Sequence, residues 1–223
     1  MKKQILSILP LLVACQFVTA EETQEASGFY GSAFGGAAVF NDGSVDVASN
    51  PSGAADFEIE AGLSLGLRLG YDFGTFRVEG EYTYASGDIE SLETSTGDVS
   101  VDSDITSNAV MLNALVDFDL SSSVLLSAGV GIGASNVQYG SMENGAITAV
   151  DAVDETVFSY QGIIRASYLL SENATLGVSY RYLVTDDVSG AGIVDTNVSN
   201  QQSEIDFDSV GVSLFEIFFS YEF

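Results

Sequence analysis

Residues 57 to 73 alternate between apolar and polar side chains without interruption. The apolar face carries Phe57, Ile59, Ala61, Leu63, Leu65, Leu67, Leu69, Tyr71 and Phe73, and the residues between them are mostly charged, polar or glycine. A period of two is the period of a β-strand with two unlike faces. This segment is long enough to cross a hydrocarbon layer at a tilt.

The same alternation recurs along the chain and predicts eight strands. We expect them at about residues 28–40, 57–73, 76–84, 105–118, 124–137, 155–170, 174–184 and 205–223. Short turns at 74–75, 121–123 and 171–173 alternate with long polar loops at 41–56, 87–104, 138–154 and 185–204. On the first strand, which is rich in Gly and Ala, we place Phe29, Ala33, Ala37 and Val39 outward. On the last strand the apolar parity changes at Leu214–Phe215, which predicts a β-bulge there.

Two all-β architectures fit eight such strands, and the distribution of charge separates them. A soluble sandwich or lipocalin-like barrel would turn its apolar faces inward and its polar faces to water. The chain has 6 basic and 32 acidic residues, a formal net charge of −26, and no Lys after residue 3. The remaining basic residues are arginines in the middle of strands, on the polar face. Arginines opposite carboxylates fit a narrow, poorly hydrated interior, where the guanidinium makes bidentate pairs.

The sequence therefore predicts an eight-stranded antiparallel up-and-down transmembrane β-barrel with four long extracellular loops. Its apolar face would contact lipid and its lumen would be filled by side chains. The predicted lumen network consists of Arg68, Arg77, Arg165, Arg181, Glu58, Glu60, Glu79, Glu81, Asp117 and Glu216. Aromatic girdles are expected from Phe57, Tyr71, Phe73, Phe76, Tyr84, Tyr168 and Phe223 near the strand ends.

The first twenty residues have the features of a secretory signal peptide. Lys2 and Lys3 precede a mostly apolar segment, and Val18-Thr19-Ala20 presents small residues before Glu21. Cleavage after Ala20 would leave a periplasmic leader at 21–27 and the barrel domain at 28–223. An alternative is lipidation at Cys15, because Leu12-Val13-Ala14-Cys15 resembles the lipobox of bacterial lipoproteins.

Several segments resemble the OmpA-like and Opa-like family of eight-stranded outer-membrane β-barrels, which includes many porin-family surface antigens. The resemblance rests mainly on Gly66-Leu-Arg-Leu-Gly-Tyr-Asp-Phe-Gly-Thr-Phe-Arg-Val-Glu-Gly-Glu-Tyr82, with weaker matches at 113–118, 129–133 and 179–182. The final strand, which ends on Phe219, Tyr221 and Phe223, resembles the terminal segment that the barrel-assembly machinery reads. The resemblance implies a bacterial outer-membrane location with both termini in the periplasm.

The resemblance implies a structural, surface-antigen or adhesin-like role, with a small-solute channel as the alternative. An outer-membrane enzyme is less expected, because the chain has no His and its single Cys lies in the predicted signal peptide, and no cofactor is predicted. The acidic loops exclude a basic nucleic-acid surface. They offer Asp98, Asp102 and Asp104 as weak candidates for a divalent cation, although the spacing of an EF-hand is missing. The partners expected are membrane lipid and lipopolysaccharide, the assembly machinery, and any surface ligand that the loops recognise.

Overall fold

The computed structural model describes residues 27–41, 43–47, 55–94, 97–140, 142–144, 147–150, 153–196, 199–207 and 209–223. The predicted signal peptide, the leader up to residue 26 and the lipidation site lie outside these residues. None of the described residues belongs to a helix long and apolar enough to cross a membrane.

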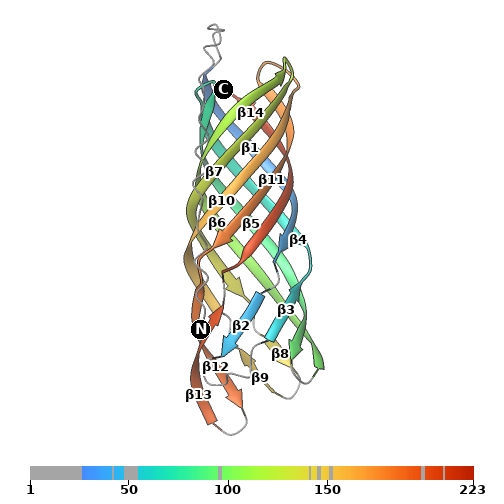
Figure 1. Ribbon diagram of the computed structural model, residues 1–223, viewed down its shortest axis with the longest axis vertical. Helices are drawn as coiled ribbons and strands as arrows, with labels where there is room; N and C mark the ends of the chain where they lie inside the picture. The colour runs from blue at the N-terminus through green and yellow to red at the C-terminus, as the bar shows by residue number, and fades with distance from the viewer. Residues whose placement is uncertain are drawn as a thin grey trace, which may run out of the picture.

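The described strands form a closed antiparallel barrel (Figure 1). Its wall consists of β1 (Gly28–Phe40), β4 (Gly62–Asp72), β5 (Phe76–Thr94), β6 (Gly97–Ser121), β7 (Val124–Tyr139), β10 (Val153–Leu169), β11 (Ala174–Thr185) and β14 (Gly211–Glu222). Each wall strand pairs with the wall strands that precede and follow it in the chain. The first, β1, pairs with the last, β14, which completes the ring. The prediction of an eight-stranded up-and-down barrel is confirmed.

The two ends of the barrel differ, as the spacing of the turns predicted. At one end the strands are joined by short turns at 73–75, 122–123 and 170–173, and the C-terminus lies there (Figure 1). Gly74 has a φ of 93°, a conformation that glycine adopts without steric cost, and its amide donates a hydrogen bond of 2.7 Å to Asp72 Oδ1. We call this end the short-turn end, and the opposite end the hairpin end.

The segments predicted as loops contain further strands at the hairpin end. β5 and β6 remain paired as far as Thr94 and Gly97. Additional strands are β2 (Gly43–Val47), β3 (Ala55–Ile59), β8 (Met142–Asn144), β9 (Ile147–Val150), β12 (Val188–Thr196) and β13 (Ser199–Phe207). The loop prediction was wrong in this respect, because polar composition alone does not distinguish a solvated strand from a loop.

The predicted strand at 57–73 is also divided, because β3 ends at Ile59 and β4 begins at Gly62. The register between β3 and β5 shifts at Glu58/Ile59. Gly62 lies so close to β5 that a Cβ added to it would be 1.6 Å from the carbonyl oxygen of Ser86. The strand is therefore interrupted where the alternation of side chains gave no sign of a break.

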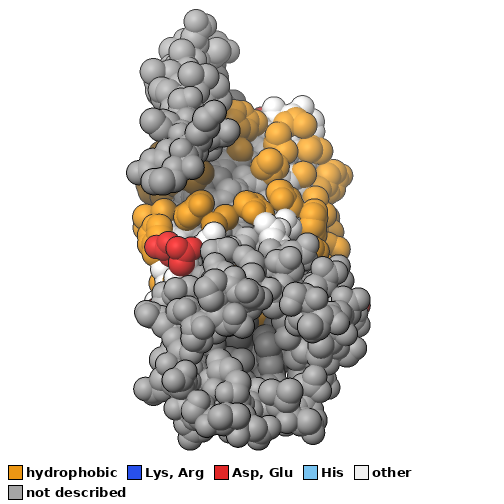
Figure 2. Space-filling view, turned by 60° about the horizontal axis from the view of Figure 1, so that its bottom comes forward, with side chains coloured by type: hydrophobic (Ala, Val, Ile, Leu, Met, Phe, Trp, Pro, Cys, Tyr) orange, Lys and Arg blue, Asp and Glu red, His pale blue; other side chains and the backbone are white. Residues whose placement is uncertain are grey.

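Apolar side chains cover the outside of the wall, and polar ones fill much of the inside. Leu69 and Ile217 are 71% and 63% exposed. Figure 2 shows hydrophobic side chains covering the part of the barrel wall that it displays. On β1 the side chains of Phe29, Ala33, Ala37 and Val39 are exposed, as predicted. An outer surface this apolar requires lipid rather than water around it.

The predicted β-bulge at Leu214–Phe215 was wrong. The register of β14 runs without a shift against both β1 and β11. Leu214 is fully buried inside the barrel while Phe215 is exposed on its outside. The parity of apolar residues changes because the lumen positions toward the hairpin end carry Val212 and Leu214, while the opposite face carries Gly211 and Ser213 there.

Candidate functional site

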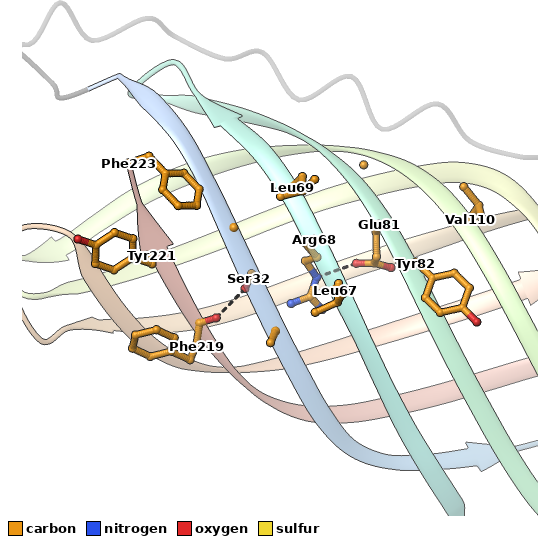
Figure 3. A pocket seen from close by; sticks show the side chains of 13 residues that line it. Ser32, Leu67, Arg68, Leu69, Glu81, Tyr82, Val110, Phe219, Tyr221 and Phe223 are labelled. Atoms are coloured by element: carbon orange, nitrogen blue, oxygen red, sulfur yellow. Dashed lines mark hydrogen bonds and ion pairs between the residues drawn. The ribbon is translucent and has the colours of Figure 1, made fainter.

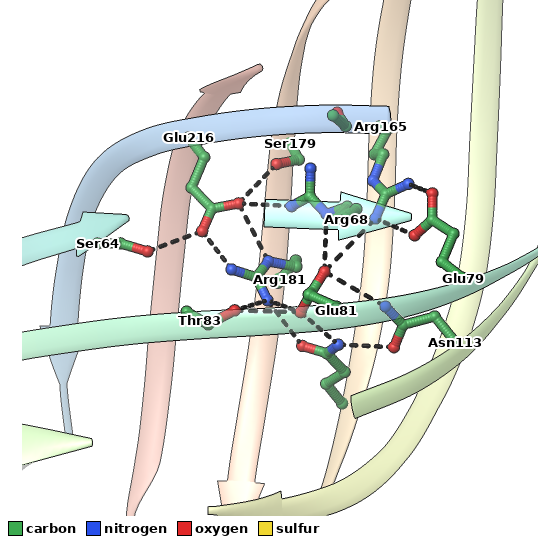
Figure 4. A network of polar contacts seen from close by, with 12 residues as sticks. Ser64, Arg68, Glu79, Glu81, Thr83, Asn113, Arg165, Ser179, Arg181 and Glu216 are labelled. Atoms are coloured by element: carbon green, nitrogen blue, oxygen red, sulfur yellow. Dashed lines mark hydrogen bonds and ion pairs between the residues drawn. The ribbon is translucent and has the colours of Figure 1, made fainter. Parts of the chain in front are cut away.

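The middle of the lumen is occupied by three arginines and three glutamates, which we call the central cluster. Its members are Arg68 on β4, Glu79 and Glu81 on β5, Arg165 on β10, Arg181 on β11 and Glu216 on β14 (Figure 4). All six side chains are at most 5% exposed, and their formal charges cancel. An alternating strand places every second side chain inward, so a charged residue at such a position must find a partner across the lumen.

Each arginine of the central cluster bridges two carboxylates. Arg181 donates through Nε to Glu216 Oε2 at 3.0 Å and through its two Nη atoms to Glu216 and Glu81. Arg68 donates to Glu81 Oε2 at 2.7 Å and to Glu216 Oε2 at 3.0 Å. Arg165 makes a bidentate pair with Glu79 at 2.5 and 2.8 Å, and its Nη2 lies 3.8 Å from Glu81 Oε2. The six groups therefore form one continuous network across the lumen.

Neutral polar side chains occupy much of the remaining hydrogen-bonding capacity of the glutamates. Ser64 and Ser179 donate to Glu216 at 2.8 and 2.9 Å. Gln161 donates to Glu81 at 3.1 Å and to Asn113 Oδ1 at 2.8 Å. A carboxylate with this many donors is held in one position, so the arrangement is suited to closing the lumen rather than to moving a proton.

Two aromatic side chains of β1 lie inside the lumen and pack on this cluster. The guanidinium carbon of Arg68 lies 3.8 Å from the centre of the Phe34 ring, and that of Arg181 lies 4.8 Å from it. The hydroxyl of Tyr30 donates to Glu79 Oε1. Glycines on β4 make room for both rings, because a Cβ at Gly66 or Gly70 would lie within 2.5 Å of the Phe34 or Tyr30 ring.

A second ion-paired group lies nearer the short-turn end. Arg77 Nε is 2.6 Å from Asp117 Oδ2 and 2.9 Å from Asp72 Oδ2. These residues line a cavity of about 720 Å³ that opens at the short-turn end, together with Asp119, Glu172 and Glu222 among others. The charged side chains that line this part of the lumen are predominantly acidic.

Toward the hairpin end the buried side chains of the lumen are uncharged and mostly apolar, with Ser107, Ser135, Ser159 and Thr185 between the apolar ones. The buried side chains that form this apolar layer are Ala38, Phe40, Ala85, Ile105, Ala109, Val137, Val157, Leu183, Val210, Val212 and Leu214. Apart from Val210, which immediately precedes β14, they come from the seven wall strands other than β4. The central cluster therefore lies between an apolar layer on one side and the acidic cavity on the other.

Most of the residues predicted for the lumen are brought together. The four arginines contact Glu79, Glu81, Asp117 and Glu216, and Asp72 is added to them. Glu60 does not join this group, because it is exposed in the bend between β3 and β4. The side chain of Glu58 lies outside the described ones. Sequence reasoning missed Phe34 and Tyr30, although both have the parity opposite to that of the outward residues Phe29 and Ala33.

The remaining predicted residues lie away from the lumen. Asp104 is exposed on β6, and the side chains of Asp98 and Asp102 lie outside the described ones. Among the side chains that the structure describes, no group of three acidic or sulfur ligands is placed to hold a metal ion. The terminal aromatics Phe219, Tyr221 and Phe223 are exposed on the outside of the barrel. Of the predicted girdle, Tyr71, Phe73 and Phe76 form a chain of ring contacts with centroid separations of 4.6 and 4.4 Å.

Comparison with known proteins agrees with this architecture. The structure of the Neisserial surface protein A (NspA) is similar with a TM-score of 0.51 and 19% identity, covering 89% of this chain and 100% of that one. OprG from Pseudomonas aeruginosa is similar with a TM-score of 0.65 and 13% identity, covering 88% and 97%. AlkL is similar with a TM-score of 0.52 and 18% identity, covering 92% and 94%. At these identities the likeness shows the fold alone, and no curated protein matches the sequence.

The family assignment rests on the sequence itself. The profile of the outer membrane protein beta-barrel domain matches residues 7–223, nearly the whole chain. The closed wall, the apolar exterior and the ion-paired lumen are the features that such a domain needs in a bilayer. The chain therefore belongs to the outer membrane protein β-barrel family, and it is a protein of the bacterial outer membrane.

Proposed function

We propose that this protein is a non-enzymatic, non-conducting barrel that anchors its long hairpins at the cell surface, where they act as a surface antigen or an adhesin-like element. The observation that carries the proposal is the closed lumen. A solute would have to pass the central cluster and then the apolar layer, and opening the cluster would leave buried charges without partners at a cost of several kcal/mol each.

The carboxylates available for catalysis are already engaged. Glu79 and Glu81 stand two residues apart and could in principle act as an acid and a base. Glu79 is bound by both nitrogen donors of Arg165, and Glu81 contacts all three arginines of the central cluster. Groups held in this way are structural, which favours a role outside catalysis.

A channel is the second candidate, because the cavity of about 720 Å³ at the short-turn end provides half of a pore. Recording from single purified barrels in planar bilayers separates the two functions. We expect no steady conductance from the native protein. A steady conductance that Arg77→Ala or Glu79→Ala abolishes would overturn the closed lumen and favour a pore.

The proposed orientation places both termini and the short turns in the periplasm and the hairpins outside. It can be tested with single cysteines at exposed positions of the two ends, Glu172→Cys in a short turn and Asp186→Cys at the hairpin end. A membrane-impermeant maleimide added to whole cells should label only the Asp186→Cys protein, with the unaltered chain as the background control. Labelling of Glu172→Cys alone would reverse the orientation.

A further inference from the structure

The outside of the barrel is hollowed along β1 near the short-turn end, and we call this hollow the β1 groove. It has a volume of about 660 Å³ and is lined almost entirely by apolar surface (Figure 3). The volume lies within the range of about 300–1,000 Å³ that is usual for small-molecule sites. It differs from the rest of the wall because small residues lie between two rows of large ones.

The floor and the walls of the groove come from different strands. Gly31 and Ala33 of β1 leave the floor low, and Gly80 of β5 widens the hollow on the far side of Leu69. Leu67, Leu69, Tyr82 and Val110 rise on one side, and Phe219, Tyr221 and Phe223 rise on the other (Figure 3). Ser32, Arg68 and Glu81 also line the floor, and since their side chains are buried in the lumen they contribute backbone. The groove therefore reaches down to the wall of the barrel.

We propose that the β1 groove binds one acyl chain of a phospholipid. The groove is continuous with the exposed apolar belt, so its surroundings are hydrocarbon and not water. An empty hollow of this size would forfeit the dispersion contacts of its lining atoms. A second barrel fits poorly. Its wall is also convex, so it would contact the large side chains on both sides of the groove and could not reach the floor between them. A flexible acyl chain can follow the groove and contact both rows of side chains.

The position of the groove selects the leaflet. Gly31 lies against the C-terminal residue, since a Cβ added to it would be 3.5 Å from the Phe223 ring. The groove thus lies toward the short-turn end, and the headgroup of the bound lipid would be at that end. This leaflet assignment, and nothing else in the inference, rests on the proposed orientation: with the short turns in the periplasm the lipid belongs to the inner leaflet.

Three glycines provide matched variants. A Cβ at Gly80 has only one atom within 4 Å, the carbonyl oxygen of Leu69 at 3.9 Å, so Gly80→Leu fills the groove without a clash in the wall. A Cβ at Gly31 makes only ordinary contacts of 3.5 to 3.6 Å, so Gly31→Leu fills the groove from its floor on β1, on the other side of β4 from Gly80. Gly162 on β10 is exposed and has no neighbour within 4 Å, and Gly162→Leu adds the same side chain elsewhere on the lipid face.

The test uses the full-length protein in vesicles of phosphatidylethanolamine and phosphatidylglycerol, with a trace of phosphatidylethanolamine that carries a diazirine on its acyl chain. After irradiation, peptides are mapped for the attached lipid. We expect peptides that contain Leu67, Leu69 or Phe219 to be labelled preferentially in the native protein and severalfold less in Gly80→Leu and Gly31→Leu. Gly162→Leu should keep the native pattern. Uniform labelling of the wall, or no change in the groove variants, would overturn the inference.

Two readouts keep the outcome separate from other failures. The gel mobility of unboiled samples shows that each variant is folded before it is irradiated. The second readout is chemical cross-linking of protein to protein. Dimers that form with the native protein and disappear only in the groove variants would identify a second copy as the occupant and refute the proposal that a lipid binds there. Conductance reports on the lumen and is independent of the groove, so the closed-lumen function stands or falls without regard to lipid labelling.

Discussion

The pair of Arg165 and Glu79 allows the central cluster to be tested quantitatively. Its two hydrogen bonds of 2.5 and 2.8 Å are buried, and Tyr30 donates a third to Glu79. Breaking a buried pair by removing one partner typically costs about 3–5 kcal/mol, because the other charge stays buried without compensation. Since Arg165 keeps Glu81 at 3.8 Å, we expect Glu79→Gln to cost about 3 kcal/mol, at the lower end of this range.

The double variant distinguishes the ion pair from ordinary packing. Arg165→Gln should cost a similar amount alone, whereas Glu79→Gln with Arg165→Gln removes both charges and leaves two amides that can bond to each other. We expect the double variant to lose about 3 kcal/mol instead of the summed 6, which is a coupling energy of about 3 kcal/mol. The assay is urea unfolding in lipid vesicles, with the folded fraction read from unboiled gels.

Arg77→Gln is the control, because it alters an arginine whose side chain is 20% exposed beside the open cavity. Its partners Asp72 and Asp117 are 14% and 4% exposed, so we expect a loss between those of a surface pair and a fully buried pair, about 1–2 kcal/mol and smaller than that of Glu79→Gln. A coupling energy below about 0.5 kcal/mol between Glu79 and Arg165 would refute the reasoning. The central cluster would then be hydrated, and the closed lumen would lose its main support.

Three further predictions concern other parts of the wall. Gly70→Ala should destabilise the barrel by about 1–3 kcal/mol in the same assay, since its Cβ would lie 2.5 Å from the Tyr30 ring, while the outward Gly80→Ala should be neutral; equal effects would contradict the packing of Tyr30. Leu214→Ala should cost about 2–5 kcal/mol as a core residue, whereas the cavity left by Ile217→Ala is filled by lipid; a reversed order would restore the β-bulge that the register excludes. Deletion of Phe223 should lower the amount of folded barrel in outer-membrane fractions. Phe215→Ala, which changes an aromatic farther from the C-terminus on the same outer face, should not. An unchanged amount after deletion of Phe223 would show that the terminal aromatic is not an assembly signal.

The sequence predicts the fold well where the two faces of a strand meet different surroundings. On β4 the leucines face lipid while Arg68 belongs to the central cluster, so the residue types alternate with a period of two. On β1 the outward positions from Gly31 to Ala37 are all Gly or Ala, so the contrast between the two faces is weak there. Phe34 and Tyr30 fill the lumen from that strand, and an inward aromatic cannot be distinguished by type from an outward one.

The error on β14 has a related cause. Leu214 and Phe215 are both apolar, yet one belongs to the apolar layer of the lumen and the other to the lipid face. The sequence analysis assumed that the lumen is polar along its whole length. It therefore interpreted the change in apolar parity as a β-bulge, although the change reflects a different polarity of the lumen at this level. The partners of each arginine were equally out of reach, because they depend on the relative stagger of strands as far apart in the chain as β5 and β14.

The choice of arginine over lysine follows from this stagger. Arg181 reaches Glu216 and Glu81 at once, and Arg68 reaches the same two carboxylates from another strand. The planar guanidinium presents separate donors in fixed directions, whereas the donors of a lysine ammonium surround a single atom and cannot form bidentate pairs with a carboxylate on each side. Every basic residue after Lys3 is therefore committed to the inside of the barrel, where its charge is cancelled. Among the residues that the structure describes, exposed carboxylates such as Asp104, Glu172 and Asp186 lie toward the two ends of the barrel, which separates their negative charge from the neutral central cluster.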